Sequence, residues 1–168
     1  VLLLSFGFSQ QIIHTETYEN GNIKSITYHK KSRTVIEKVK YEAYYVNGQK
    51  EVEETFKDGE EDGVYTGWYE NGQKLVEVTY KYGKQDGLGT SWYENGQKEY
   101  EATFKNGKEY GVTTQWYQNG QKEYEGTYKD GELISEKCWD EDGNECQEKL
   151  FDELIIEDII VGQGAEAV

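Results

Sequence analysis

The sequence has little apolar content and few basic residues. Its hydrophobic fraction is 35% and its mean hydropathy is −0.92, which is low for a domain built around a thick central core. Lys and Arg number 18 against 33 Asp and Glu, so the net charge is −15, and no basic stripe is interleaved with aromatic residues. Phosphate backbones and anionic lipid surfaces would repel such a chain. We therefore expect no nucleic-acid partner and no binding to an anionic membrane.

Cysteine and histidine are also scarce. The only cysteines, Cys138 and Cys146, are eight positions apart, and His14 and His29 lie far from them in the sequence, so no zinc site is expected. In an oxidising compartment the two cysteines are disulfide candidates, whereas in a reducing one they would stay free thiols. The chain has no nucleophile-elbow serine, phosphate loop or Cys–His pair. We expect no catalytic, cofactor-binding or metal-binding residues in it.

Methionine is absent, so the N-terminus is expected to be cut. Residues 1–9 are mostly apolar and end in two small residues, Gly7 and Ser9, at the spacing that a signal peptidase needs for cleavage before Gln10. This pattern predicts a partial signal peptide over residues 1–9 and export to the periplasm or cell surface of a bacterium. The alternative is that the same residues form a buried first strand.

Aromatic residues, in contrast, are abundant. They make up 14% of the chain and include 15 Tyr and 4 Trp. Disordered acidic chains are poor in aromatics, so disorder is rejected. Low hydropathy combined with many aromatics is typical of thin sheets held together by aromatic ladders.

The sequence repeats itself every 24 residues. The tetrapeptide Asn-Gly-Gln-Lys begins at Asn47, Asn71, Asn95 and Asn119, and a Lys-x-Gly turn follows each copy. Fixed-period similarity is the signature of a repeat architecture, and Asn-Gly between alternating apolar residues is a strong hairpin signal. We therefore predict an all-β protein, an elongated antiparallel meander of tandem hairpin repeats over residues 10–148.

The register of each hairpin follows from the length of its Asn-Gly loop. A two-residue loop, Asn71-Gly72, would set Trp68 opposite Leu75. A three-residue loop that includes Glu70 sets Val64 opposite Val78 and Thr66 opposite Val76 instead. Only the second gathers the apolar residues on one face, and we prefer it. It places Val64, Thr66 and Trp68 on the same face as Val76, Val78 and Tyr80.

Imperfect hairpins flank the four regular units, as expected of capping repeats. Residues 18–22 form the degenerate first turn, and residues 139–144 form the diverged last one. A three-residue loop centred on Asp142 in the last hairpin would bring Cys138 and Cys146 face to face, close enough for a disulfide.

The repeated motif Trp-Tyr-Glu-Asn-Gly-Gln-Lys resembles the MORN repeat variant found in many bacterial proteins. It occurs over residues 68–74 and 92–98, and over 116–122 with Gln118 in place of Glu, and the resemblance covers roughly residues 11–148. It implies an elongated, twisted meander. Some members of the family carry an antitoxin label, and eukaryotic relatives are linked to membranes and scaffolding.

Repeated aromatic side chains suit contact with a protein or a glycan, and we expect a protein partner. The candidate interaction residues are Trp68, Tyr69, Trp92, Tyr93, Trp116 and Tyr117.

The tail breaks the pattern. Residues 149–168 carry no repeat and are expected to be a linker followed by the start of another domain. Residues 154–168 resemble the opening strand of FKBP-type peptidyl-prolyl isomerases. That likeness implies a longer parent protein with isomerase activity, whose prolyl pocket would lie beyond Val168. The alternatives are a plain linker or final strand, and a stand-alone antitoxin-like or structural repeat protein.

Overall fold

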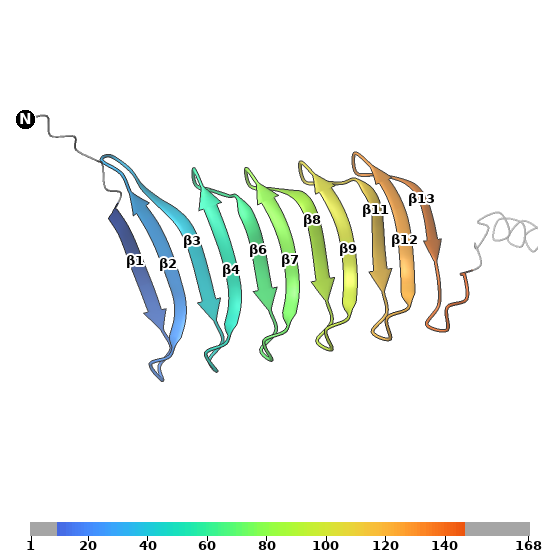
Figure 1. Cartoon of the computed structure of the whole chain (residues 1–168), viewed down its shortest axis with the longest axis horizontal. Helices are drawn as coiled ribbons and strands as arrows, with labels where there is room; N and C mark the ends of the chain where they lie inside the picture. The colour runs from blue at the N-terminus through green and yellow to red at the C-terminus, as the bar shows by residue number, and fades with distance from the viewer. Residues whose placement is uncertain (1–9, 147–168) are drawn as a thin grey trace, which may run out of the picture.

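The computed structural model describes residues 10–146, and these form one open, antiparallel sheet of 13 strands with no helix. Figure 1 shows the strands side by side in a single layer, in the order in which they occur in the chain. The predicted all-β meander is therefore confirmed. The expected signal peptide and the expected start of an isomerase domain lie outside the described residues.

The strands are β1 (Gln10–Thr17), β2 (Ile23–Lys31), β3 (Ile36–Tyr44), β4 (Lys50–Lys57), β5 (Glu60–Glu61), β6 (Gly63–Trp68), β7 (Lys74–Lys81), β8 (Lys84–Trp92), β9 (Lys98–Lys105), β10 (Lys108–Glu109), β11 (Gly111–Trp116), β12 (Lys122–Lys129) and β13 (Glu132–Cys138).

Turns of two kinds alternate along the sheet. At the Asn-Gly turns, Tyr69 N donates to Gln73 O at 2.8 Å and Gly72 N donates to Tyr69 O at 2.9 Å, which closes the predicted three-residue loop. At the Lys-x-Gly turns, both central residues have positive φ, as at Tyr82 (52°) and Gly83 (70°). Two consecutive positive φ values define the two-residue hairpin turn whose twist matches that of its strands. The 24-residue period is thus one turn of each kind plus two strands.

The predicted pairing of the two strands is wrong by one residue, because a β-bulge interrupts it. Beside the Asn-Gly turn, Trp68 pairs with Lys74, but the next pair is Gly67 with Val76. The unpaired Leu75 shifts every later pair, so that Val64 lies opposite Thr79. The same shift recurs in the β3–β4, β8–β9 and β11–β12 hairpins.

The bulge sends the two apolar sets to opposite sides of the sheet. One side, here called the tyrosine face, carries Tyr65, Val76, Val78, Tyr80, Tyr100, Ala102, Phe104, Tyr124 and Tyr128. The other side, here called the tryptophan face, carries Val64, Thr66, Trp68, Glu77, Thr90, Trp92, Glu101, Thr114 and Trp116. The expectation that Val64, Thr66 and Trp68 share a face with Val76, Val78 and Tyr80 is therefore incorrect. One-residue register changes always exchange the faces of a strand.

No conventional core exists in the described residues. The buried hydrophobic residues are Val78 (8% exposed) and Ala102 (1%), both on the tyrosine face. Aromatic rings cover the centre of that face by lying over glycines: a Cβ placed on Gly89 would be 3.0 Å from the ring of Phe104. On the tryptophan face, the buried residues are Glu42 and the threonines Thr66, Thr90 and Thr114. The low hydropathy of the sequence thus corresponds to a single layer with a thin cover on each side.

The hairpins at the two ends of the described array depart from the regular repeat, as predicted. Strands β1 and β2 are joined through a turn in which Tyr18 N donates to Asn22 O at 2.8 Å. In the last hairpin, Trp139 pairs with Glu145. There, Cys146 N donates to Cys138 O at 2.9 Å, and the Cα atoms of the two cysteines are 5.3 Å apart and joined through a disulfide. That spacing is typical of a hydrogen-bonded antiparallel pair. Formation of the bond in the cell stays a prediction.

Candidate interaction surface

One tyrosine in each repeat links its hairpin to the next. The Tyr69 hydroxyl donates to the Trp92 carbonyl oxygen at 2.7 Å, and the Tyr93 hydroxyl donates to that of Trp116 at 2.6 Å. The same bond joins three more pairs of neighbours: Tyr18 to Tyr44, Tyr45 to Trp68, and Tyr117 to Trp139. Each bond ties the turn of one hairpin to the end of a strand in the next, so the tyrosine of the motif has a structural role.

The asparagine and glutamine of the motif connect consecutive Asn-Gly turns. Asn95 Oδ1 accepts from Gln97 N at 3.0 Å and shapes its own turn, while Asn95 Nδ2 donates to Gln118 O in the next turn at 3.0 Å. The Gln73 side chain lies against the turn of the following repeat, where a Cβ added to Gly96 would be 2.7 Å from Gln73 Oε1. The turns therefore form a continuous hydrogen-bonded edge of the sheet.

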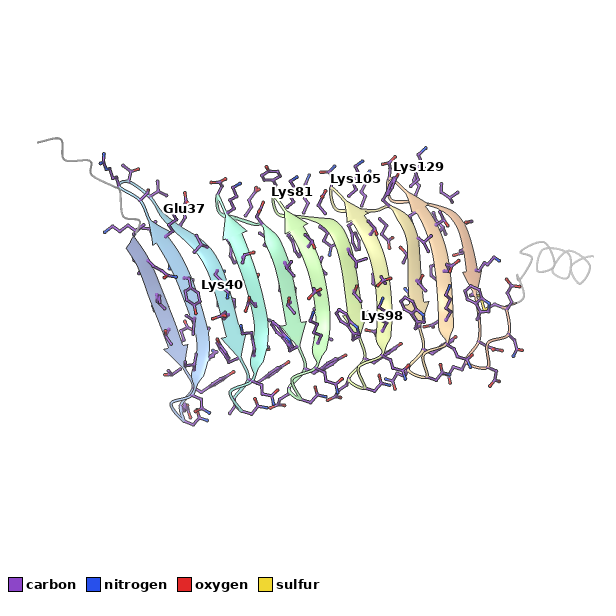
Figure 2. The ribbon with its side chains drawn as sticks, in the orientation of Figure 1. Glu37, Lys40, Lys81, Lys98, Lys105 and Lys129 are labelled. Atoms are coloured by element: carbon purple, nitrogen blue, oxygen red, sulfur yellow. A yellow bond between two sulfur atoms is a disulfide. The ribbon has the colours of Figure 1, made fainter. Side chains whose placement is uncertain are left out.

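On the tryptophan face, tryptophan and lysine alternate across the strands. Lys74 Nζ lies 5.6 Å from the centre of the Trp92 ring, and Lys98 Nζ lies 5.7 Å from that of Trp116, within cation–π range. Each lysine also forms an ion pair with the glutamate three residues later, as Lys98 does with Glu101. Figure 2 shows Lys98 on the open face of the sheet, whereas Lys81, Lys105 and Lys129 follow the edge made by the Lys-x-Gly turns. Each lysine of this row therefore has a carboxylate partner on the same face.

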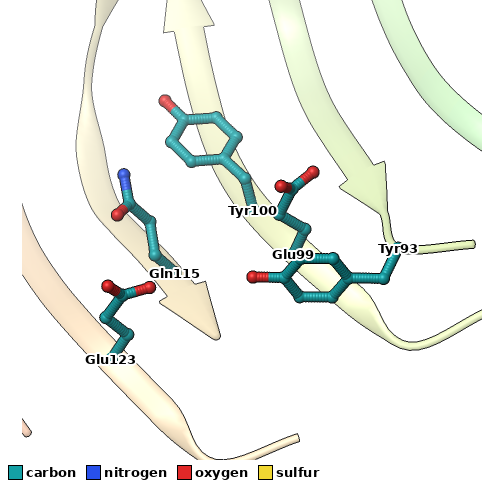
Figure 3. A pocket seen from close by; sticks show the side chains of 5 residues that line it. All are labelled: Tyr93, Glu99, Tyr100, Gln115 and Glu123. Atoms are coloured by element: carbon teal, nitrogen blue, oxygen red, sulfur yellow. The ribbon is translucent and has the colours of Figure 1, made fainter. Parts of the chain in front are cut away.

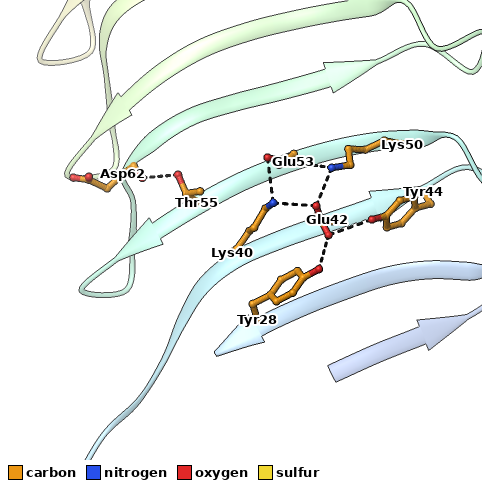
Figure 4. Close-up of polar contacts among 8 residues, drawn as sticks. All are labelled: Tyr28, Lys40, Glu42, Tyr44, Lys50, Glu53, Thr55 and Asp62. Carbon is orange, nitrogen blue, oxygen red and sulfur yellow. Dashed lines mark hydrogen bonds and ion pairs between the residues drawn. The ribbon is translucent and has the colours of Figure 1, made fainter. Parts of the chain in front are cut away.

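The first strands replace this pattern with a buried charge cluster. Glu42 stands where later repeats have threonine, and it is 6% exposed. It accepts hydrogen bonds from Tyr28 at 2.7 Å and Tyr44 at 3.1 Å, and it pairs with Lys50 at 2.8 Å and Lys40 at 3.0 Å. Figure 4 shows these groups converging on one carboxylate. Burial opposes ionisation, but the bonds from Lys50, Tyr28 and Lys40 outweigh it and lower the pKa of Glu42 from 4.5 to about 2.

A pocket of about 270 Å³ opens on the tyrosine face between the third and fourth Asn-Gly-Gln-Lys repeats. Its lining residues are Tyr93, Glu99, Tyr100, Gln115 and Glu123. In Figure 3, Tyr93, Glu99 and Tyr100 form one side, and Gln115 and Glu123 form the other. Burial, followed by the charges of Glu99 and Glu123, raises the pKa of Tyr93. The pocket therefore combines aromatic rings with negative potential.

The six residues predicted as an interaction surface do not share one face. Trp68, Trp92 and Trp116 lie half-buried on the tryptophan face beneath lysines of the preceding repeat. Tyr93 instead lines the pocket beside Tyr100. The sequence did not identify the other four residues that line the pocket, which are Glu99, Tyr100, Gln115 and Glu123.

On a regular strand, Glu99 and Glu123 would lie on the face opposite Tyr100 and Tyr124, but the bulge turns Glu99 toward Tyr100. The signal that could have revealed the bulge is the spacing Lys-x-x-Glu. Residues three apart lie on opposite faces of a regular strand and can pair only across a bulge.

Neither a metal centre nor a membrane-spanning helix occurs in residues 10–146. No group of three or more His, Cys, Asp or Glu side chains there is arranged to hold a metal ion. Within the same range, no helix has the length and apolar character that a membrane crossing demands.

The geometry defines a class of protein: an open β-hairpin repeat array in which each repeat contacts its neighbours through the same side chains. Three tandem segments of the chain, residues 61–82, 85–106 and 109–130, match the MORN repeat variant. No curated protein matches the chain. MORN repeats are commonly protein-interaction modules.

Proposed function

We propose that the array is a protein-interaction scaffold and that the tyrosine face is its binding surface. The observation that supports this choice is that carboxylates on the two faces of the third and fourth regular repeats differ in their ion pairs, although nearer the N-terminus Glu54 of the tyrosine face pairs with Lys38. On the tryptophan face, Glu77, Glu101 and Glu125 each pair with a lysine. On the tyrosine face, Glu99 and Glu123 form no ion pair with any of the described residues. A tyrosine-rich surface on which these two carboxylates have no countercharge suits a partner that supplies both contact area and positive charge.

The tryptophans contribute to the scaffold instead of to the binding surface. Each ring is covered by a lysine whose charge is already paired, so a partner would have to break both contacts to reach it. The tyrosines of the motif donate their hydroxyl groups within the array, but their rings remain available along the tyrosine face, as that of Tyr93 is in the pocket.

Site-specific photo-crosslinking tests the choice of face. A photoreactive phenylalanine analogue would replace Val76 on the tyrosine face or, as the matched control, Leu88 on the tryptophan face, in cells that naturally make the protein. We expect protein adducts from position 76 and none from position 88, where the side chain is 53% exposed. Adducts from position 88 alone, or from neither position, would contradict the proposal.

We further propose that the array works outside the cytoplasm, in the periplasm or on the cell surface, as the N-terminal accessory region of an FKBP-type isomerase. The support is the sequence of residues 1–9 and of residues 154–168, together with a partner-binding face that could bring clients to a neighbouring catalytic domain. Reading the gene beyond Val168 tests the second part. An aromatic-lined isomerase domain is expected there, and an early stop codon would favour a stand-alone structural or antitoxin-like protein.

A further inference from the structure

The pocket on the tyrosine face is lined by a pair of glutamates from adjacent repeats. Its two glutamates occupy the bulge position, the residue that the strand pairing leaves out, in consecutive repeats. The same position is held by Glu51 in the first regular repeat and by Leu75 in the second. Among the hairpins of residues 10–146, only Glu99 and Glu123 therefore place carboxylates at the bulges of adjacent hairpins, and both line the pocket.

The two carboxylates are poorly compensated within the described part of the chain. Glu99 accepts one hydrogen bond, from the Ser91 hydroxyl at 3.0 Å, and neither glutamate has a lysine or arginine within ion-pair distance. Two residues further along the same strands, Glu101 and Glu125 are each neutralised by a lysine. In these two strands, the glutamates of the pocket therefore keep an uncompensated charge, whereas those on the tryptophan face do not.

The aromatic walls of the pocket are held in place by bonds at their far ends. The Tyr93 hydroxyl donates to Trp116 O at 2.6 Å, and the Tyr100 hydroxyl donates to Glu109 Oε1 at 2.6 Å. Glu109 also accepts from Thr113 Oγ1 at 3.1 Å. A fixed ring offers its π-face to a cation without losing rotamer freedom on binding.

We propose that this pocket binds an arginine side chain of the partner protein. This inference rests on the proposed scaffold function and supplies the chemistry of its partner. A guanidinium group stacks on tyrosine, bonds to two carboxylates through its fork of donors and sheds water more readily than an ammonium group. The Gln115 side-chain carbonyl adds a further acceptor. The volume lies just below the roughly 300–1,000 Å³ of sites for drug-sized ligands, which suits one side chain.

An NMR titration of the whole chain tests the inference, with N-acetyl-arginine amide as the probe and the neutral isostere N-acetyl-citrulline amide as its control. We expect arginine amide to shift the Gln115 side-chain amide and the rings of Tyr93 and Tyr100. Citrulline amide should bind at least about tenfold more weakly, and added salt should weaken arginine binding because the contact is charged.

Two double variants locate the site. The variant Glu99→Gln/Glu123→Gln should lose arginine binding by at least about tenfold, whereas Glu101→Gln/Glu125→Gln, altered on the other face of the same strands, should bind as the wild type does. Equal binding of citrulline, or unchanged binding in the first variant, would overturn the inference.

This result is separable from that of the crosslinking experiment. Crosslinks from position 76 without arginine binding would refute the pocket and leave the scaffold. Arginine binding without crosslinks would refute the scaffold and leave the pocket as a site for a basic group.

Discussion

A single hydroxyl group per repeat stabilises the contact between neighbouring hairpins. In the variant Tyr69→Phe, the Trp92 carbonyl would lose its donor while the ring stays in place. We expect a loss of about 0.5–1.5 kcal/mol in the free energy of unfolding, the usual net value of one hydrogen bond. Urea denaturation measures it. Tyr82→Phe is the control, because Tyr82 is 61% exposed at a turn, and it should change stability by less than about 0.5 kcal/mol. Equal effects would contradict the structural role of Tyr69.

At the N-terminal end of the array, one carboxylate makes stability depend on pH. Folding lowers the pKa of Glu42 from 4.5 to about 2, so the folded state favours the ionised form. The stabilisation is therefore complete above pH 4.5 and is lost as the pH falls toward 2. At neutral pH, Glu42→Gln should cost roughly 3 kcal/mol.

Urea unfolding of both proteins between pH 7 and pH 2 provides the measurement. The difference in stability between wild type and Glu42→Gln should shrink below pH 4.5 and vanish near pH 2. Glu77→Gln is the matched control: its side chain is 40% exposed in an ion pair, and such pairs contribute up to about 1 kcal/mol. A constant difference across this range would show that Glu42 acts through packing and not through its charge.

At the scale of strands and turns, the sequence predicts the hairpins well and their faces poorly. Turn chemistry is local, so Asn71-Gly72 and Tyr82-Gly83 identify both turn types without knowledge of the rest of the chain. The bulge at Leu75 depends on what its neighbours gain: an ion pair for Lys74, and a carbonyl partner for the tyrosine of the preceding repeat. The tyrosine bond comes from the preceding repeat and is invisible in a single hairpin. The ion pair lies within one strand, and its Lys-x-x-Glu spacing indicates a bulge only when it is compared with the two-residue period of a strand. The pocket, which depends on the bulge, was missed with it.

A substitution at one Asn-Gly turn should show that strain stays local. Gly96 has φ of 85°, a conformation that a β-branched residue adopts only with strain. We expect Gly96→Val to cost on the order of 1–3 kcal/mol, with hydrogen-exchange protection lost mainly between residues 85 and 110. Gly96→Asn is the control, since asparagine tolerates this conformation and should cost less. Loss of protection along the whole array would contradict local strain.

The last hairpin offers a test of the cysteine pair. A three-residue loop at Asp142 brings Cys138 and Cys146 opposite each other, with Cα atoms 5.3 Å apart. We expect a disulfide in protein made in an oxidising compartment, with a gain of about 2–3 kcal/mol at most because the closed loop is short. Intact-mass measurement of unreduced protein detects the loss of two hydrogens. Cys146→Ser, made in the same compartment, gives the mass of a chain that cannot close the loop, and two free thiols in the wild type would contradict the pairing.

For the whole molecule, composition predicts the absence of a thick core but not the asymmetry of the two faces. Low hydropathy with many aromatics predicts a thin sheet, as found. The distribution of charge could not be predicted, because it depends on which of two neighbouring glutamates, such as Glu99 and Glu101, lies beside a lysine. The binding proposal therefore rests on a feature that only the folded array displays.

Because each repeat contacts its neighbours through the same groups, removing one whole period should leave a folded array. Deletion of residues 87–110 joins Asp86 to Gly111, which occupies the position of Gly87. The Tyr69 hydroxyl would then reach the Trp116 carbonyl, and Lys74 would cover the Trp116 ring, as they now do at Trp92. In repeat arrays, stability is close to a sum of unit and interface terms. We expect a cooperative sheet with lower stability and a urea m-value reduced in proportion to the surface removed.

Deletion of half a period, residues 87–98, is the matched control. It joins Asp86 to Glu99 and removes the Asn-Gly turn between β8 and β9, so Tyr69 and Asn71 lose the carbonyls that they now bond in the next repeat. Circular dichroism and urea denaturation should show the longer deletion folded and the shorter one largely unfolded beyond β7. If the longer deletion unfolds as fully as the shorter one, the contacts between hairpins are not interchangeable, and the array folds as a single unit whose stability cannot be divided among its repeats.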